Sequence, residues 1–134
     1  MTKINQLAYG FEKELSGVYF EEALERVTEA LQGKGFGVLT EIDVKATMKK
    51  KLDKEYPKYK ILGACNPVLA DRALTADKYI GLMLPCNVVV REVAGRVLVS
   101  VMNPQIMASM SDDPELQKIA SEAEKLVKEM LVEL

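Results

Sequence analysis

The chain has 134 residues, of which 49% are hydrophobic and 28% are charged, and its formal net charge is −2. This size and composition are typical of one folded domain spanning residues 1–134, and they disfavour both intrinsic disorder and a membrane protein. Because there is no net positive charge to attract a polyanion, we expect no nucleic-acid partner.

The N-terminal segment lacks the apolar core of a signal peptide, and no segment approaches the ~18 consecutive apolar residues of a membrane-spanning helix. We therefore expect a cytoplasmic protein without a membrane partner. The chain has two cysteines, Cys65 and Cys86. Thiols stay reduced in the cytosol, so we expect no structural disulfide between them.

The sequence contains no histidine. This excludes Ser-His-Asp and Cys-His catalysis, the HExxH zinc site and every histidine-ligated metal or haem centre. An enzyme would need a nucleophile such as Cys65 with a carboxylate or lysine as its base, and no sequence pattern supports that pairing. Whether the chain is an enzyme therefore stays open at this point.

The first predicted elements are a strand and a helix. Alternating apolar residues predict a strand over residues 4–15, with Tyr9 and Phe11 on its buried face. Over residues 20–31, apolar positions recur at helical spacing opposite a row of glutamates. This pattern predicts an amphipathic helix that ends at the following glycines.

The middle of the chain predicts two strands joined by a helix. Residues 36–43 and 59–65 alternate between apolar and polar side chains, as half-buried strands do. We place the even-numbered positions of the first strand, from Phe36 to Ile42, on its buried face. The lysine-rich segment 44–52 between the strands predicts a short helix whose narrow buried stripe consists of Val44, Met48 and Leu52.

Three later helices are predicted from their start signals. Asn66-Pro67, Asn103-Pro104 and Asp113-Pro114 each place a capping side chain before a proline, which is favoured in the first helical turn. The last of these helices has a long apolar stripe with charged residues opposite, and it is predicted to continue to the end of the chain.

Between the first two of these helices, residues 80–84, 87–93 and 96–102 predict strands, and the last two form a hairpin with a turn at Ala94-Gly95. Pro85 marks a bend or a sheet edge. The predicted fold class is therefore α+β, with an antiparallel-rich sheet and helices packed mainly on one face.

Two segments carry a Cys-Asn pair beside a proline: Gly63-Ala64-Cys65-Asn66-Pro67 and Leu84-Pro85-Cys86-Asn87. Together with the blocks at residues 35–45 and 80–85, they resemble the defining motifs of domain-of-unknown-function family 302. The resemblance implies an α+β fold similar to a single TATA-binding-protein repeat, and a homodimer. It implies no activity, and it does not carry over DNA binding, because the chain has no basic stripe with interleaved aromatic residues.

The two cysteines are the candidate site. Cys65 is expected at the end of a strand and directly before a capped helix, where the helix dipole favours a thiolate and a lowered thiol pKa. If Cys86 begins the neighbouring strand, the two sulfurs form a redox pair or a pair of soft ligands for copper(I) or zinc. Because structural zinc takes four protein ligands, we assign no metal-ligand set from the sequence.

The residues support two hypotheses. The first is a cytoplasmic, homodimeric protein that is thiol-dependent or binds a small molecule or soft metal at Cys65, Asn66, Cys86 and Asn87, with Arg72 placed to contact an anion. The ligand and any cofactor are unidentified. The alternative is a non-catalytic interaction or scaffold domain in which both cysteines are buried core filler. In either case we interpret three methionines as core packing, namely Met102, Met107 and Met110.

Overall fold

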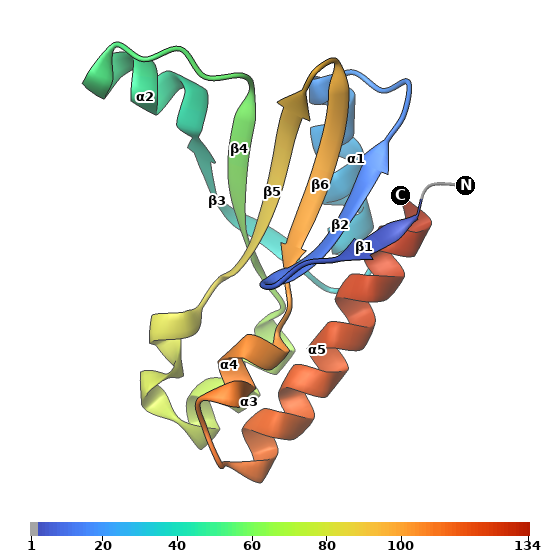
Figure 1. Ribbon diagram of the computed structural model, residues 1–134. Coiled ribbons are helices and arrows are strands. Elements are labelled where there is room, and N and C mark those ends of the chain that lie inside the picture. The colour runs from blue at the N-terminus through green and yellow to red at the C-terminus, as the bar shows by residue number, and fades with distance from the viewer. Residues whose placement is uncertain (1–2) are drawn as a thin grey trace.

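The computed structural model describes residues 3–134, and its centre is a six-stranded sheet in the order β1-β2-β6-β5-β4-β3 (Figure 1). Every neighbouring pair of strands is antiparallel. The strands are β1 (Ile4–Gln6), β2 (Gly10–Leu15), β3 (Gly37–Asp43), β4 (Tyr59–Cys65), β5 (Cys86–Val93) and β6 (Arg96–Met102).

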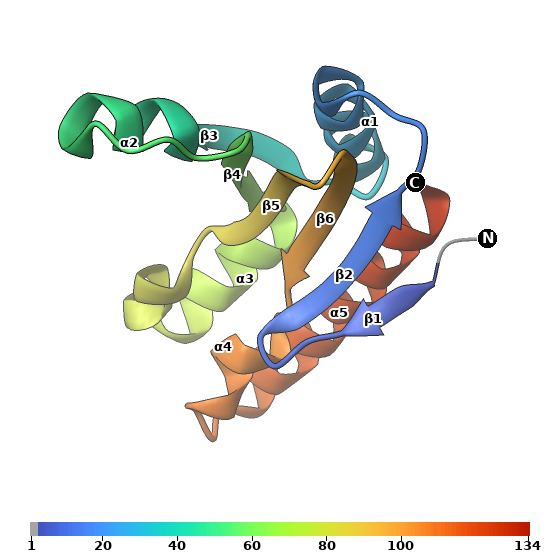
Figure 2. The ribbon, with the colours of Figure 1, turned by 45° about the horizontal axis from the view of Figure 1, so that its top comes forward.

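The helices are α1 (Phe20–Gln32), α2 (Val44–Leu52), α3 (Pro67–Ala76), the 3-10 helix η1 (Lys78–Met83), α4 (Gln105–Ser109) and α5 (Pro114–Glu133). Helices α1 and α5 cover one face of the sheet, α3, η1 and α4 lie beyond one of its ends, and α2 projects from the opposite end (Figure 2). This arrangement confirms the α+β class, because the antiparallel strands form one sheet and the helices cover mainly one of its faces.

Two apolar clusters hold the fold together. In the first, α1 and the C-terminal half of α5 pack on alternate residues of β2, β4, β5 and β6, and the central Val99 of β6 is fully buried. In the second, α3, η1 and α4 pack on the N-terminal half of α5, beyond the end of the sheet. The long helix α5 therefore joins both clusters along its single apolar stripe.

The helix-start signals are confirmed by their caps. The side-chain oxygen of Asn66 accepts a hydrogen bond from the Leu69 N–H at 3.2 Å, and α3 begins one residue after Asn66. Asp113 accepts from the Glu115 N–H at 2.8 Å where α5 begins. Such caps satisfy donors that the first turn of a helix leaves without partners, so the sequence signal is local and reliable.

The predicted strand over residues 4–15 is in fact the hairpin of β1 and β2. Its strands are connected by a tight turn in which the Leu7 N–H donates to the Gly10 carbonyl at 2.7 Å. Tyr9 lies in this turn and is 78% exposed, whereas Phe11 is buried, so the expectation that both share a buried face is wrong.

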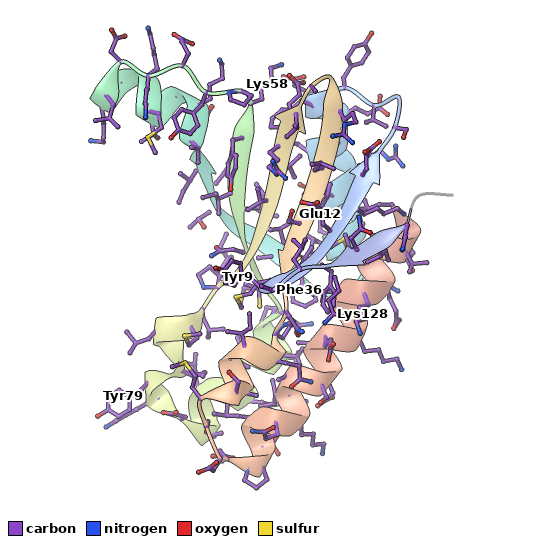
Figure 3. The ribbon with its side chains drawn as sticks, viewed as in Figure 1. Tyr9, Glu12, Phe36, Lys58, Tyr79 and Lys128 are labelled. Carbon is purple, nitrogen blue, oxygen red and sulfur yellow. The ribbon has the colours of Figure 1, made fainter. Side chains whose placement is uncertain are left out.

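The prediction of a strand over residues 80–84 is wrong. Residues 80–83 belong to the 3-10 helix η1, and residue 84 follows it. The Asp77 side chain caps η1 by accepting from the Tyr79 N–H at 2.9 Å. Tyr79 points away from the body of the molecule (Figure 3), while Ile80 packs into the second cluster. A short apolar run does not by itself distinguish a strand from a turn of helix.

The helix α2 forms as predicted, but it has no buried residue, so the expected buried stripe is wrong. Figure 1 shows α2 projecting from the end of the sheet beside β3 and β4. The edge strand β3 is also more exposed than predicted, and its Ile42 is 50% exposed. β3 is the edge strand of the sheet, and α2 follows it directly.

Candidate functional site

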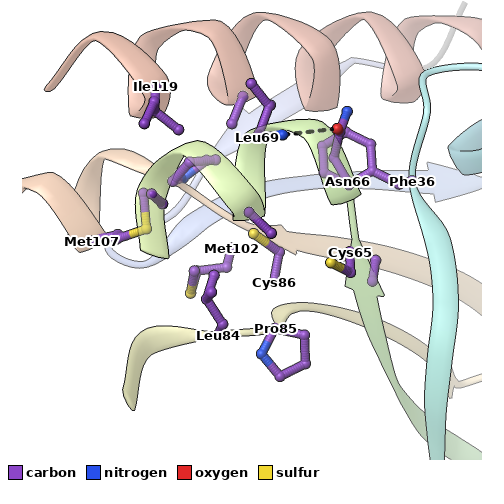
Figure 4. A pocket seen from close by; sticks show the side chains of 15 residues that line it. Phe36, Cys65, Asn66, Leu69, Leu84, Pro85, Cys86, Met102, Met107 and Ile119 are labelled. Atoms are coloured by element: carbon purple, nitrogen blue, oxygen red, sulfur yellow. Dashed lines mark hydrogen bonds between the residues drawn. The ribbon is translucent and has the colours of Figure 1, made fainter. Parts of the chain in front are cut away.

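An apolar cavity of about 40 Å³ lies at the junction of the two clusters, where the sheet meets α3, α4 and α5 (Figure 4). Both cysteines line this cavity. Cys65 ends β4, and Cys86 begins the adjacent strand β5. The remaining lining residues are Phe36, Ala64, Asn66, Leu69, Ala70, Ala73, Leu84, Pro85, Met102, Pro104, Met107, Ile119 and Ala123.

The register of β4 and β5 places the backbones of the two cysteines close together. Cys86 is paired with Ala64, the residue before Cys65, so the side chains of Cys65 and Cys86 start from opposite faces at the end of the sheet. Figure 4 shows both sulfurs at the same cavity. Both cysteines are free and half-buried.

Gly63 on β4 packs closely against Pro85, the residue before Cys86. A Cβ atom at Gly63 would collide with the hydroxyl oxygen of Thr40 and with the ring of Pro85. The absence of a side chain at Gly63 therefore lets the Pro85 ring lie close to β4. The chain enters β5 directly after this contact, and Cys86 is the first residue of that strand.

Burial raises the pKa of the Cys86 thiol to about 11, and the neighbouring Cys65 thiol adds to the shift. Cys86 is therefore protonated near neutral pH. Because the thiolate is the reactive form of cysteine, this environment works against Cys86 as a nucleophile.

Asn66 is the one amide side chain among the lining residues. Its oxygen is engaged as the α3 cap, and its Nδ2 donates to the Lys34 carbonyl at 3.4 Å. Asn66 thus shapes the cavity and the start of α3.

Two predicted site residues lie away from the cavity. Asn87 is exposed and does not contribute to the cavity lining. It follows Cys86 on β5, and consecutive strand residues point to opposite faces. Arg72 lies further along α3 and forms ion pairs with Glu115 at 3.1 Å and with Glu122 at 2.8 Å, both on α5. Its guanidinium therefore ties α3 to α5.

Two methionines contribute to the cavity lining, and the sequence did not assign them to the site. Met107 is buried, as expected for core packing, and Met102 is half-buried, while both bring a thioether to the cavity wall. Met110 is 81% exposed, so the packing expected of it is wrong. Because a methionine at a cavity and one in a packed core have the same apolar spacing, no sequence signal separates them.

Within residues 3–134, no group of three or more histidine, cysteine, aspartate or glutamate side chains is arranged to hold a metal ion. The two thiols therefore stand without a carboxylate partner in the described part of the chain. Among the described residues, no helix has the length and hydrophobicity of a membrane-spanning segment.

The family model described as "Domain of unknown function DUF302" matches residues 11–134. The chain belongs to the DUF302 family. The resemblance found in the Cys-Asn segments is thereby confirmed. The structure is also similar to the crystal structure of an uncharacterized conserved DUF302 protein from Bacillus stearothermophilus, with a TM-score of 0.86 and 30% sequence identity over 95% of this chain and 98% of that one. A comparison with curated proteins gives no match.

Proposed function

We propose that this DUF302 protein binds a small thiophilic ligand at the cavity that Cys65 and Cys86 line. One observation carries the proposal: two cysteines that are distant in sequence line the same apolar cavity. Sulfur is the most polarisable donor in proteins, and paired thiols are preferred by soft, thiophilic ligands. The need for reduced thiols also supports a cytoplasmic location.

The size of the cavity narrows the class of ligand. Pockets for drug-sized organic molecules usually have volumes of roughly 300–1,000 Å³, whereas this cavity has about 40 Å³. A cavity of this size has room for a single ion or a few atoms. It therefore favours a compact ligand over a larger organic substrate.

The protonation of Cys86 argues against thiol catalysis as the main function. A catalytic cysteine usually has a lowered pKa and a nearby cation or base, whereas the pKa of Cys86 is raised to about 11. A tightly bound thiophilic ligand displaces the thiol proton, so a protonated resting thiol is compatible with binding.

The alternative in which both cysteines are core filler has less support. Protein interiors are close-packed and have few voids, yet Cys65 and Cys86 are only half-buried and border a cavity. A packing role alone does not require two thiols at the same void.

Retention of Hg²⁺ against an excess of a monothiol tests the proposal. Two thiols on one scaffold act as a chelate, so we expect wild type to keep one ion per chain and to lose it at least about 100-fold more slowly than Cys65→Ser or Cys86→Ser. Equal release from wild type and both variants would show that the thiols do not act as a pair and would overturn the proposal.

As a second candidate function, we propose that the chain is a homodimeric interaction domain. The supporting observation is the segment formed by β3 and α2, where Leu39, Ile42 and Leu52 are exposed and α2 has no buried residue. A nine-residue helix is marginally stable in water without packing. A second copy covering this segment would supply that packing.

A further inference from the structure

We infer that the cavity at the end of the sheet is a binding site for a neutral, apolar diatomic gas such as dioxygen, held by contacts alone. The inference goes beyond the proposed function, because it needs the cavity but no bond to either sulfur atom. It follows from the apolar wall of the cavity, from its volume and from the half-exposed side chains on one side of it.

The inner wall of the cavity is apolar. Ala73 of α3, Met107 of α4, and Ile119 and Ala123 of α5 are all buried and line it. The lining includes no carboxylate, hydroxyl or cationic side chain. An ion that forms no bond to sulfur would lose its hydration there without gaining polar partners. The wall therefore favours an uncharged, apolar guest.

The polar groups at the cavity offer little to a water molecule. The side-chain oxygen of Asn66 accepts from the Leu69 N–H, and its Nδ2 donates to the Lys34 carbonyl, so both ends of the amide are engaged. Burial raises the pKa of the Cys86 thiol to about 11, so this thiol is neutral near pH ~7. A buried water usually needs roughly two to four polar partners. The cavity therefore favours an apolar molecule over water.

The volume of the cavity limits the guest to a few atoms. An apolar cavity of ~150 Å³ stays dry and takes up benzene or xenon, whereas this cavity has about 40 Å³ and is too small for an aromatic ring. A diatomic gas is compact enough to fit. Four sulfur-containing side chains line the cavity, from Cys65, Cys86, Met102 and Met107. Because sulfur is polarisable, these side chains add dispersion attraction for an apolar guest.

A guest can enter the cavity from one side. Cys65, Leu84, Pro85 and Met102 are half-buried, whereas the residues that α3 and α5 contribute to the inner wall are mainly buried. Figure 4 shows Leu84 and Pro85 on the side of the cavity opposite Ile119 of α5. Partly exposed side chains change rotamer quickly, so a small neutral molecule reaches the cavity without opening of the core.

The test is uptake of xenon by the full, reduced chain, followed by NMR of its methyl groups as the gas pressure is raised. We expect saturable chemical-shift changes at Ala73, Met107 and Ile119. Dioxygen, which is paramagnetic, should then relax these methyl groups more than those of Val127, which is equally buried but lies in the first cluster. Absence of saturable shifts, or equal relaxation at Val127, would overturn the inference. A resident water detected in the cavity by water–protein NOEs would overturn it as well.

Ala73→Val is the cavity-filling variant, because its added methyl groups take up the space of the guest. We expect its xenon affinity to be at least about tenfold lower than that of wild type, since close-packed groups leave no room for the gas. Ala46→Val is the matched control, because Ala46 is exposed on α2 and lies outside the cavity lining. It should keep the wild-type affinity. Circular dichroism checks the fold of both variants, and equal affinity of the two would overturn the site.

The xenon and Hg²⁺ experiments separate this inference from the proposed function. A wild-type protein that takes up xenon but releases Hg²⁺ as fast as Cys65→Ser and Cys86→Ser contradicts the proposed function alone. A wild-type protein that retains Hg²⁺ but shows no saturable xenon shift contradicts this inference alone.

Discussion

The ammonium group of Lys13 on β2 donates a hydrogen bond of 2.8 Å to the carbonyl oxygen of Leu131 in the last turn of α5. It donates a second, of 2.7 Å, to the carbonyl oxygen of Leu134. Lys13 is only 6% exposed, and it is the one buried charged residue in the described part of the chain. The last carbonyl groups of a helix lack partners within the helix and favour a cation, so Lys13 anchors the end of α5 to the sheet.

Lys13→Met keeps the apolar stem of the side chain and removes the ammonium group. We expect the free energy of unfolding to fall by about 2 kcal/mol, because hydrogen bonds from a charged donor are lost and buried carbonyl groups are left without partners. Urea denaturation measures this change. Lys125→Met, at an exposed position on α5, is the control and should stay within about 0.5 kcal/mol of wild type. Equal effects of the two variants would contradict the anchoring role.

The raised pKa of Cys86 predicts a stability change at high pH in the metal-free protein. The folded state holds this proton up to about pH 11, whereas the unfolded chain releases it near pH ~8.5. Stability from this group is therefore complete below the unfolded pKa and is lost as the pH rises through the folded pKa, by about 3 kcal/mol. Cys86→Ala should lack this loss, and other groups cancel in the comparison. Parallel pH profiles of the two proteins would refute the prediction.

Gly63→Ala tests whether the close packing of Pro85 against Gly63 stabilises the fold. The new methyl group would collide with Thr40 and with the ring of Pro85, and we expect a loss of about 2 kcal/mol from such overpacking. Gly37→Ala on the adjacent strand is the matched control, because no atom lies within 4 Å of its added Cβ. Thermal denaturation measures the stability of both variants. A Gly63→Ala protein as stable as Gly37→Ala would show that Pro85 does not pack closely against Gly63.

Arg72→Met tests whether this residue is structural. The Arg72 guanidinium lowers the pKa of the Glu122 carboxyl group through their hydrogen bond, so the pKa of Glu122 should rise towards its ordinary value in the variant. A carboxyl titration followed by NMR measures this shift. Retention of Hg²⁺ should be unchanged, because Arg72 lies outside the cavity lining. A loss of Hg²⁺ retention would return Arg72 to the candidate site.

Leu52→Glu tests the proposed homodimer at α2. Leu52 is 65% exposed on this projecting helix, and a charge there would be costly if a second copy covers it. Sedimentation equilibrium should show a dimer for wild type and mainly monomer for the variant. Leu82→Glu on η1, where the side chain is 87% exposed, should remain dimeric. A monomeric wild type, or equal behaviour of both variants, would rule out this interface.

Local signals in the sequence predicted several elements well. The apolar spacing of α1 and α5 and the capping residues Asn66 and Asp113 act over a few residues, so their effect can be read without the fold. The Cys-Asn segments pointed to the DUF302 family for the same reason, because a motif is a property of adjacent residues. The exposed face of α2 could not be read in this way, since apolar spacing indicates a helix without showing that anything covers it.

Local patterns in the sequence were enough to predict the α+β class and most of the helices and strands. The tertiary structure alone decided that Cys65 and Cys86 share one cavity, that Met102 and Met107 contribute to its wall, and that Arg72 and Asn87 lie outside it. The reason is physical: a helix or strand is specified by interactions between near neighbours, whereas a cavity depends on the register of β4 with β5 and on the packing of α3 and α5 against the sheet end.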